Sequence, residues 1–113
     1  MRKIRPTRYY SKKQENKVAK EVNGRRTANS GATTFQKGDV VADDFLIECK
    51  TTTTSKSSFS IKREWIEKNE EEAFAMGKTH SVIAFSFGES EPNYYVLNEK
   101  QFKEYVELLK TDL

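Results

Sequence analysis

Two short apolar runs that contain acidic side chains constrain the fold of this chain more than any other feature. The runs Asp39–Ala42 and Phe45–Lys50 are rich in residues that favour strands, and only Asp43 and Asp44 separate them. This pattern predicts an antiparallel hairpin with a very short turn. The hairpin matters because ionisable groups stand inside strands that otherwise look buried.

The expected pairing of the hairpin brings two carboxylates together. A turn that is symmetric about the two aspartates sets Asp39 opposite Glu48 and Val41 opposite Leu46, whereas a three-residue loop would break this pairing. Side chains alternate across a strand, so Glu48 and Lys50 share one face with Leu46. Phe45, Ile47 and Cys49 take the other face. Opposed carboxylates destabilise a sheet unless a positive charge lies close by, and Lys50 or a divalent cation can supply it.

The first helix is expected to contain an acidic residue on its core-facing side. Ser11 and Gln14 have the spacing of a capping box, which predicts a helix from about Lys12 to Val22, after an extended or disordered basic arm at residues 1–10. Within the helix, Glu15 is in line with the apolar stripe. Either Glu15 is buried and meets a cation, or it lies at the rim of the stripe and reaches solvent.

The remaining segments extend the pattern to αβββαββα. A short strand is expected between Arg25 and Lys37, and a helix from Ile61 to Met76, capped by Ser60, with an apolar face made of Ile61, Trp65, Ala73 and Met76. Two strands and a last helix follow. The strands are expected at Ser81–Phe87 and Tyr94–Leu97, and the helix is capped by Asn98 and buries Phe102, Tyr105, Val106 and Leu109. We therefore expect one α/β domain over residues 1–113, with a central mixed sheet flanked by helices.

Charge is distributed unevenly along the chain. Residues 1–26 hold ten Lys or Arg side chains against two acids, although the net charge of the whole chain is only +3. Such a segment favours a polyanionic partner, nucleic acid first, and the alternative is a solvated basic arm. A single cysteine and the absence of a long apolar run predict a protein that has no disulfide, does not span a membrane, and stays in the cytoplasm.

The acidic and basic residues together resemble a known signature. Gly38-Asp39, followed by Glu48-Cys49-Lys50 on the adjoining strand and preceded by Glu15 on the first helix, is similar to the motif of the PD-(D/E)XK nuclease superfamily. Gly38 stands where the motif has proline, and this departure changes none of the expected metal ligands. Within the superfamily, the chain most resembles the small archaeal-type Holliday junction resolvases and their phage relatives, over roughly residues 12 to 87. Those proteins similarly have a basic beginning and a loop like Asn29-Ser30-Gly31-Ala32.

The resemblance implies a restriction-endonuclease-like core and a metal-dependent endodeoxyribonuclease. Glu15, Asp39, Glu48 and Lys50 would form the catalytic set, and the first three, with the backbone carbonyl of Cys49, would bind Mg²⁺, for which Mn²⁺ would substitute. Lys50 would position or activate the attacking water. The substrate would be branched DNA, above all a four-way junction, and symmetric cutting implies a homodimer, in the host cytoplasm if the chain is phage-encoded. DNA contacts are expected from Arg5, Arg8, Lys12, Lys13, Arg25, Arg26, Ser30 and Lys62.

Other interpretations stay open on the sequence alone. A general or nicking nuclease of the same superfamily would cut plain duplex or flaps as well as junctions. A non-catalytic nucleic-acid-binding module would use only the basic segment, with the carboxylates forming an ordinary polar hairpin face. We interpret Cys49 as a small buried thiol rather than a nucleophile, and His80 as a solvated strand end. Trp65, Phe85 and Phe87 are expected in the core.

Overall fold

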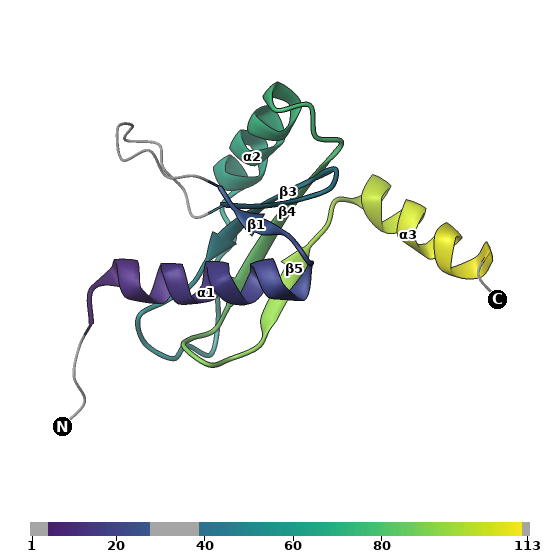
Figure 1. The fold of residues 1–113 in the computed structure, drawn as a ribbon. Coiled ribbons are helices and arrows are strands. Elements are labelled where there is room, and N and C mark those ends of the chain that lie inside the picture. The colour runs from purple at the N-terminus through teal and green to yellow at the C-terminus, as the bar shows by residue number, and fades with distance from the viewer. Residues whose placement is uncertain (1–4, 28–38, 112–113) are drawn as a thin grey trace.

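The residues that the structure describes form five strands and three helices. A computed structural model describes residues 5–27 and 39–111 (Figure 1). The elements are α1 (Thr7–Glu21), β1 (Arg25–Arg26), β2 (Asp39–Ala42), β3 (Phe45–Lys50), α2 (Arg63–Ala75), β4 (His80–Ser86), β5 (Asn93–Val96) and α3 (Glu99–Thr111). The predicted α/β class is confirmed, and the helices and strands follow one another in the expected order.

All five strands form a single mixed sheet. Their spatial order is the same as their order along the chain, from β1 to β5. The pair β3 and β4 is parallel, and the other neighbouring pairs are antiparallel. A parallel pair needs a long crossover connection, and α2 provides it.

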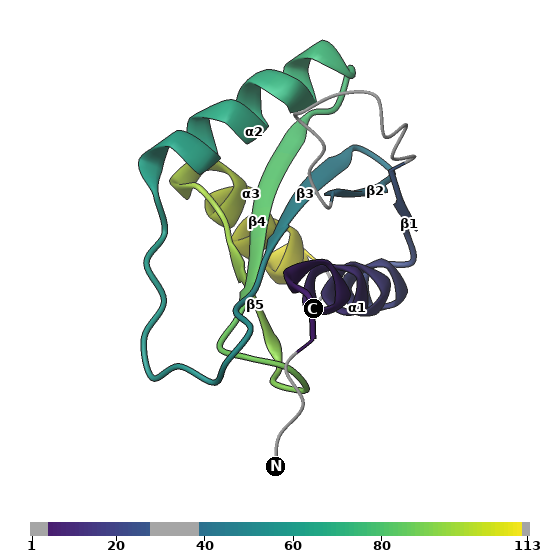
Figure 2. The same ribbon diagram turned by 90° about the vertical axis from the view of Figure 1, so that its left-hand side faces the viewer.

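Helices α1 and α2 lie on opposite faces of this sheet (Figure 2). On the α1 face, Val18 packs in a buried cluster with Val40 and Ile47. On the α2 face, Ala73 packs with Leu46 and Val41. Because Leu46 and Ile47 are neighbours in β3, the expected alternation of this strand between two faces is confirmed.

Helix α1 begins earlier than the sequence pattern predicts. Pro6 is its N-cap residue and no side chain caps it, so Ser11 does not begin the helix. The carbonyl of Pro6 accepts a 2.9 Å hydrogen bond from the Tyr9 amide, so the first turn already closes on the proline, before Ser11. The prediction of an extended arm is therefore wrong for Thr7 to Tyr10, and residues 1–4 lie outside the described residues.

Helix α2 differs from prediction at both ends of its apolar stripe. Lys62 rather than Ser60 is the N-cap residue, and Met76 is exposed. The most deeply buried side chain of the helix is polar: Asn69 is fully enclosed, and its Nδ2 is within hydrogen-bonding distance of the Leu46 and Val82 carbonyls and of the Ser81 hydroxyl. Asn69 thus joins α2 to both β3 and β4.

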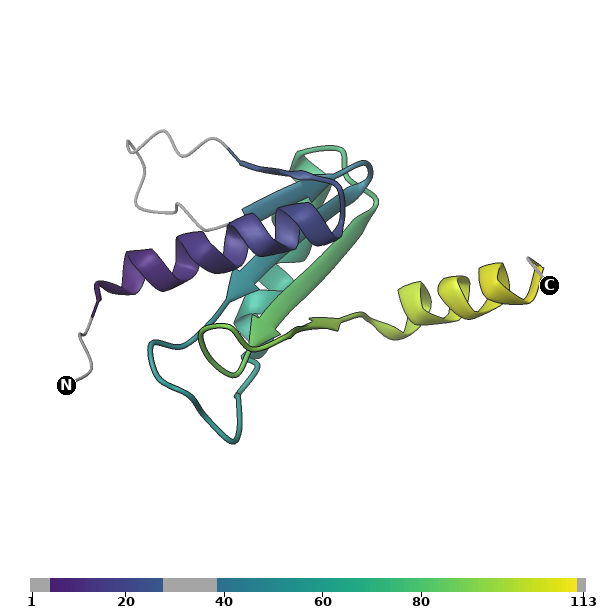
Figure 3. The ribbon, with the colours of Figure 1, turned by 60° about the horizontal axis from the view of Figure 1, so that its bottom comes forward.

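Helix α3 extends away from the rest of the molecule (Figure 3). The Oδ1 atom of Asn98 accepts a hydrogen bond of 2.8 Å from the Gln101 amide, which confirms the predicted cap. However, no residue of α3 is buried, so the prediction that its apolar stripe is core is wrong. The radius of gyration of 14.9 Å exceeds the ~13 Å typical of a chain of this length. None of the described helices is long and apolar enough to cross a membrane.

Replacing Asn69 by aspartate tests this buried link. A carboxylate cannot donate to the surrounding oxygens and is not solvated there, so Asn69→Asp should lower the free energy of unfolding by about 3 kcal/mol at pH 7. Burial raises a carboxyl pKa, so the loss should shrink as the pH falls and the group becomes neutral. Chemical denaturation at pH 7 and pH 4.5 measures both effects. The same substitution at the exposed cap, Asn98→Asp, is the control and should be nearly neutral.

Candidate active site

The hairpin brings Asp39 and Glu48 together as the sequence predicts. The two residues are directly opposed partners of β2 and β3, and Val41 is opposed to Leu46. Only 7% of Asp39 and 2% of Glu48 is exposed. Two carboxylates at opposed positions have Cβ atoms about 5 Å apart, which is close enough to share one cation.

A tight two-residue turn sets this register. Asp43 adopts a left-handed φ of 49°, which aspartate tolerates better than most residues because its short side chain bonds locally. The turn is also held by the beginning of β4 and the connection before it, because Lys78 Nζ donates to the Asp43 carbonyl at 2.6 Å and the His80 amide donates to the Asp44 carbonyl at 2.9 Å. These bonds fix the hairpin that aligns the two acids.

Lys50 follows Glu48 on the same face of β3 and is held by an aromatic ring. Its Nζ lies 4.4 Å from the ring centroid of Trp65, at the beginning of α2, and Lys62 Nζ lies 5.8 Å from the same ring. A cation over an indole ring is attracted by the negative charge of the ring face. Trp65 is half-buried beside the ring of Phe59. The sequence indicated a core residue, and nothing in its spacing pointed to this contact with Lys50.

Gln14 fixes the backbone at the end of the same strand. Its buried side chain donates a 2.7 Å hydrogen bond from Nε2 to the Lys50 carbonyl and also lies 3.1 Å from Oδ1 of Asn93. The capping-box pattern assigned this residue to the beginning of the helix instead. Gln14 therefore connects α1 to the strand that contains Glu48 and Lys50.

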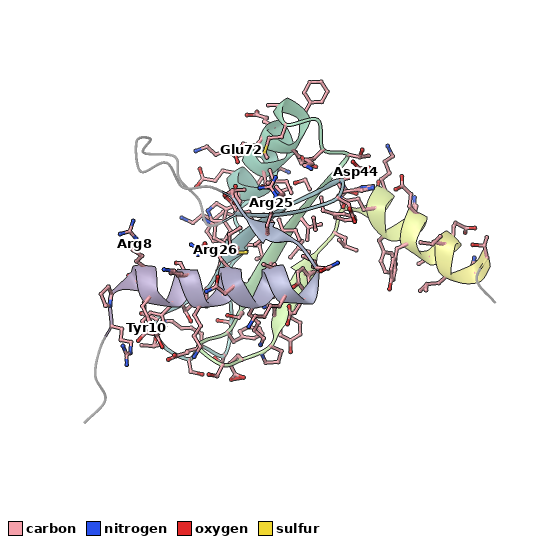
Figure 4. The ribbon with its side chains drawn as sticks, viewed as in Figure 1. Arg8, Tyr10, Arg25, Arg26, Asp44 and Glu72 are labelled. Atoms are coloured by element: carbon pink, nitrogen blue, oxygen red, sulfur yellow. The ribbon has the colours of Figure 1, made fainter. Side chains whose placement is uncertain are left out.

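Glu15 is buried, and a protein cation meets it. Its Oε1 lies 3.1 Å from Nε of Arg26 on β1. Burial raises the pKa of Glu15, while the hydrogen bond and the charge of Arg26 act in the opposite direction. Of the two alternatives for this residue, the structure shows burial with a cation. Figure 4 shows Arg26 close to α1, so this arginine is engaged inside the protein.

The carboxylates fit a metal site of two protein ligands. Within residues 5–27 and 39–111, no group of three or more His, Cys, Asp and Glu side chains is arranged to hold a metal ion. The structure brings Asp39 and Glu48 together, whereas Glu15 is engaged with Arg26. Mg²⁺ in nucleotide-processing sites commonly uses one or two carboxylates, with waters and phosphate oxygens completing the octahedron. The opposed pair meets this minimum.

The thiol of Cys49 lies on the other face of β3. It packs against the cluster that contains Val18 and Ile47, as expected for a small buried thiol. Burial, and then the negative charges of Glu15 and Asp39, raise its pKa well above the ordinary range. The thiol is therefore a poor nucleophile, and a metal contact from the Cys49 carbonyl stays a prediction.

The residues expected to contact DNA fall into two groups. Arg8, Lys12, Arg25 and Lys62 are exposed, and Figure 4 shows Arg8 projecting from the beginning of α1. The others make contacts within the protein. Arg5 lies over the ring of Tyr9, Lys13 forms a 2.8 Å ion pair with Glu89, and Arg26 binds Glu15. Ser30 and its loop lie outside the described residues.

Comparison of the chain with models of protein families, with curated proteins and with solved structures finds no match. We therefore infer function from the geometry of the site and from the sequence motif.

Removing the arginine partner of Glu15 tests the electrostatics of this region. Arg26→Gln leaves a buried carboxylate without its cation and should lower the free energy of unfolding by about 1–3 kcal/mol at pH 7. The raised pKa of Glu15 gives the sign: as the pH falls through it, the carboxyl becomes neutral and the deficit of the variant should shrink. Denaturation curves at pH 7 and pH 4 give the values. The exposed neighbour provides the control Arg25→Gln, and an equal loss in the control would contradict the assignment.

Proposed function

We propose that this protein is a metal-dependent, structure-selective DNA endonuclease with a restriction-endonuclease-like core, and that its first-choice substrate is a Holliday junction. One observation carries the proposal: Asp39 and Glu48 are buried and directly opposed, and Lys50 follows on the same face. The same three residues form the centre of the PD-(D/E)XK motif.

The residues of the chain divide the expected chemistry between them. Asp39 and Glu48 would hold Mg²⁺, and Mn²⁺ would substitute for it. The bound ion would lower the pKa of a water molecule and offset negative charge on the scissile phosphate. Lys50 contributes a further positive charge at the end of the strand, where it would orient the water and the phosphate oxygen. Trp65 limits the positions that the flexible lysine side chain can take.

The exposed basic side chains support a polyanionic substrate. Arg8, Lys12 and Arg25 are exposed on α1 and β1, and Lys62 is exposed beside Trp65. Contacts with phosphates from such residues supply affinity that does not depend on base sequence, which suits an enzyme that recognises the shape of a junction. Symmetric cleavage of a junction also requires two active sites, and therefore a homodimer.

Cleavage of labelled DNA tests the proposed activity. With Mg²⁺, the wild type should cut a four-way junction at paired symmetric positions and should leave a matched linear duplex largely intact. Lys50→Ala should lower the cleavage rate by about a hundredfold or more, because a group that stabilises developing charge is lost. Lys56→Ala, at an exposed position in the loop after β3, is the matched control and should cut normally.

Two outcomes would contradict parts of this proposal. Equal cutting of junction and duplex would assign a general or nicking nuclease instead. Tight DNA binding without cleavage, with Mg²⁺ or Mn²⁺ and unaffected by Asp39→Asn, would favour a non-catalytic binding module.

Trp65 provides a finer test as a positioning residue. Trp65→Leu removes the ring that holds Lys50 and should lower kcat about tenfold with little effect on KM. Trp65→Phe keeps an aromatic ring and should restore much of the rate. A purely structural role would lower thermal stability in both variants and would leave kcat unchanged at a temperature at which both are folded.

A further inference from the structure

Helix α3 presents an apolar face that nothing in the described chain covers. Four large apolar side chains of the helix are between 50% and 58% exposed, namely Phe102, Tyr105, Leu108 and Leu109. Their spacing places them on one side of the helix, whereas Lys100, Lys103, Glu107 and Lys110 lie on the other. An isolated helix of this length is marginal in water, so a stable α3 needs a partner for this face.

An apolar groove lies directly beside the helix. It has a volume of about 660 Å³, and its walls include Phe45, Ile47 and Val82 of the sheet together with Tyr105 and Leu108 of α3. The sheet residues belong to the α1 face, because Ile47 and Val82 pack in the same cluster as Val18. The groove is therefore on the opposite side of the sheet from Leu46, Glu48 and Lys50.

We infer that the groove and α3 form the interface of a two-fold homodimer, in which the α3 of each copy packs into the groove of the other. A two-fold interface uses the same patch on both subunits, so it needs a ridge and a groove that complement each other on one chain. Helix α3 and the neighbouring groove provide both.

The exposed area matches what a stable dimer needs. The four α3 side chains, with Phe45 and Tyr95 beside the groove, present about 600 Å² of largely apolar surface if each offers about 200 Å² when free. A standard interface buries ~800 Å² on each partner, of which somewhat more than half is apolar. A contiguous patch of this size is at the upper limit for a monomer.

The charge of α3 favours a second copy over a strongly charged partner. The helix contains three acids, Glu99, Glu104 and Glu107, and three lysines, Lys100, Lys103 and Lys110. Two copies can therefore approach without net repulsion. The described basic residues between Arg5 and Arg26 lie outside α3, so packing of α3 against a second copy does not use them.

The inferred dimer extends the proposed function, which requires two active sites. Its test measures molecular mass, so it can fail even if the protein cleaves DNA as proposed. Sedimentation equilibrium of the full chain from roughly 1 to 100 µM should give twice the monomer mass of 13.1 kDa. The double variant Tyr105→Gln/Leu108→Gln should weaken association at least about a hundredfold, since two buried apolar side chains are lost. Lys103→Gln/Glu107→Gln, on the other face of α3 and also without change in net charge, should dimerise like the wild type.

A second variant, in the sheet wall of the groove, tests the interface without changing the stability of α3. Phe45→Ser changes the groove without touching α3 and should also favour the monomer. Trp65 fluorescence, from the far side of the sheet, reports that each variant is folded. A wild type that stays monomeric throughout the range would overturn the inference, as would dimers that persist in the Tyr105/Leu108 variant. A monomer that binds lipid vesicles through α3 would overturn it as well and would assign the apolar face to a membrane surface.

Discussion

A carboxylate inside a small domain destabilises the fold unless a cation lies close to it, and the described part of this chain buries three of them. Much of the arrangement of the site follows from that constraint. Glu15 draws Arg26 of β1 against α1, which fastens the edge of the sheet to the helix. Asp39 and Glu48 face each other across the hairpin, with Lys50 at the end of the same strand. In a purely structural core, these buried charges would lower the stability of the fold without a function. The proposed binding of a cation and a phosphate would explain why the chain contains them.

The sheet separates two kinds of surface. On the α2 side, Glu48, Lys50 and Trp65 gather polar and aromatic groups around the end of β3. On the α1 side, Ile47 and Val82 form a core that continues into the open groove beside α3. Neighbouring residues of one strand point to opposite faces. The strand β3 therefore contributes alternate side chains to each of the two surfaces. The proposed catalytic site and the inferred dimer interface could therefore share this strand without using the same side chains.

The local features of this fold were largely predictable from sequence. The period of two in β3 and the length of the turn were sufficient to predict that Asp39 opposes Glu48. Tertiary contacts were not predictable in the same way. Asn69 looks like a surface residue on α2, and its burial depends on carbonyls that only the parallel pairing of β3 and β4 brings together. Helix α3 shows the converse limit, because a strong apolar stripe predicts that a face will be covered but does not say which molecule covers it.

The two-residue turn at Asp43 also has an evolutionary consequence. Adding or removing one residue there would shift β2 against β3 by one position and turn the side chains of one strand to the opposite face. Asp39 would then no longer share a face with Glu48 and Lys50. Substitutions in the turn that accept a left-handed backbone, such as glycine or asparagine, leave the alignment intact. Descendants of this sequence should therefore keep the length of the turn constant, while the residue at position 43 varies among those that accept a left-handed backbone.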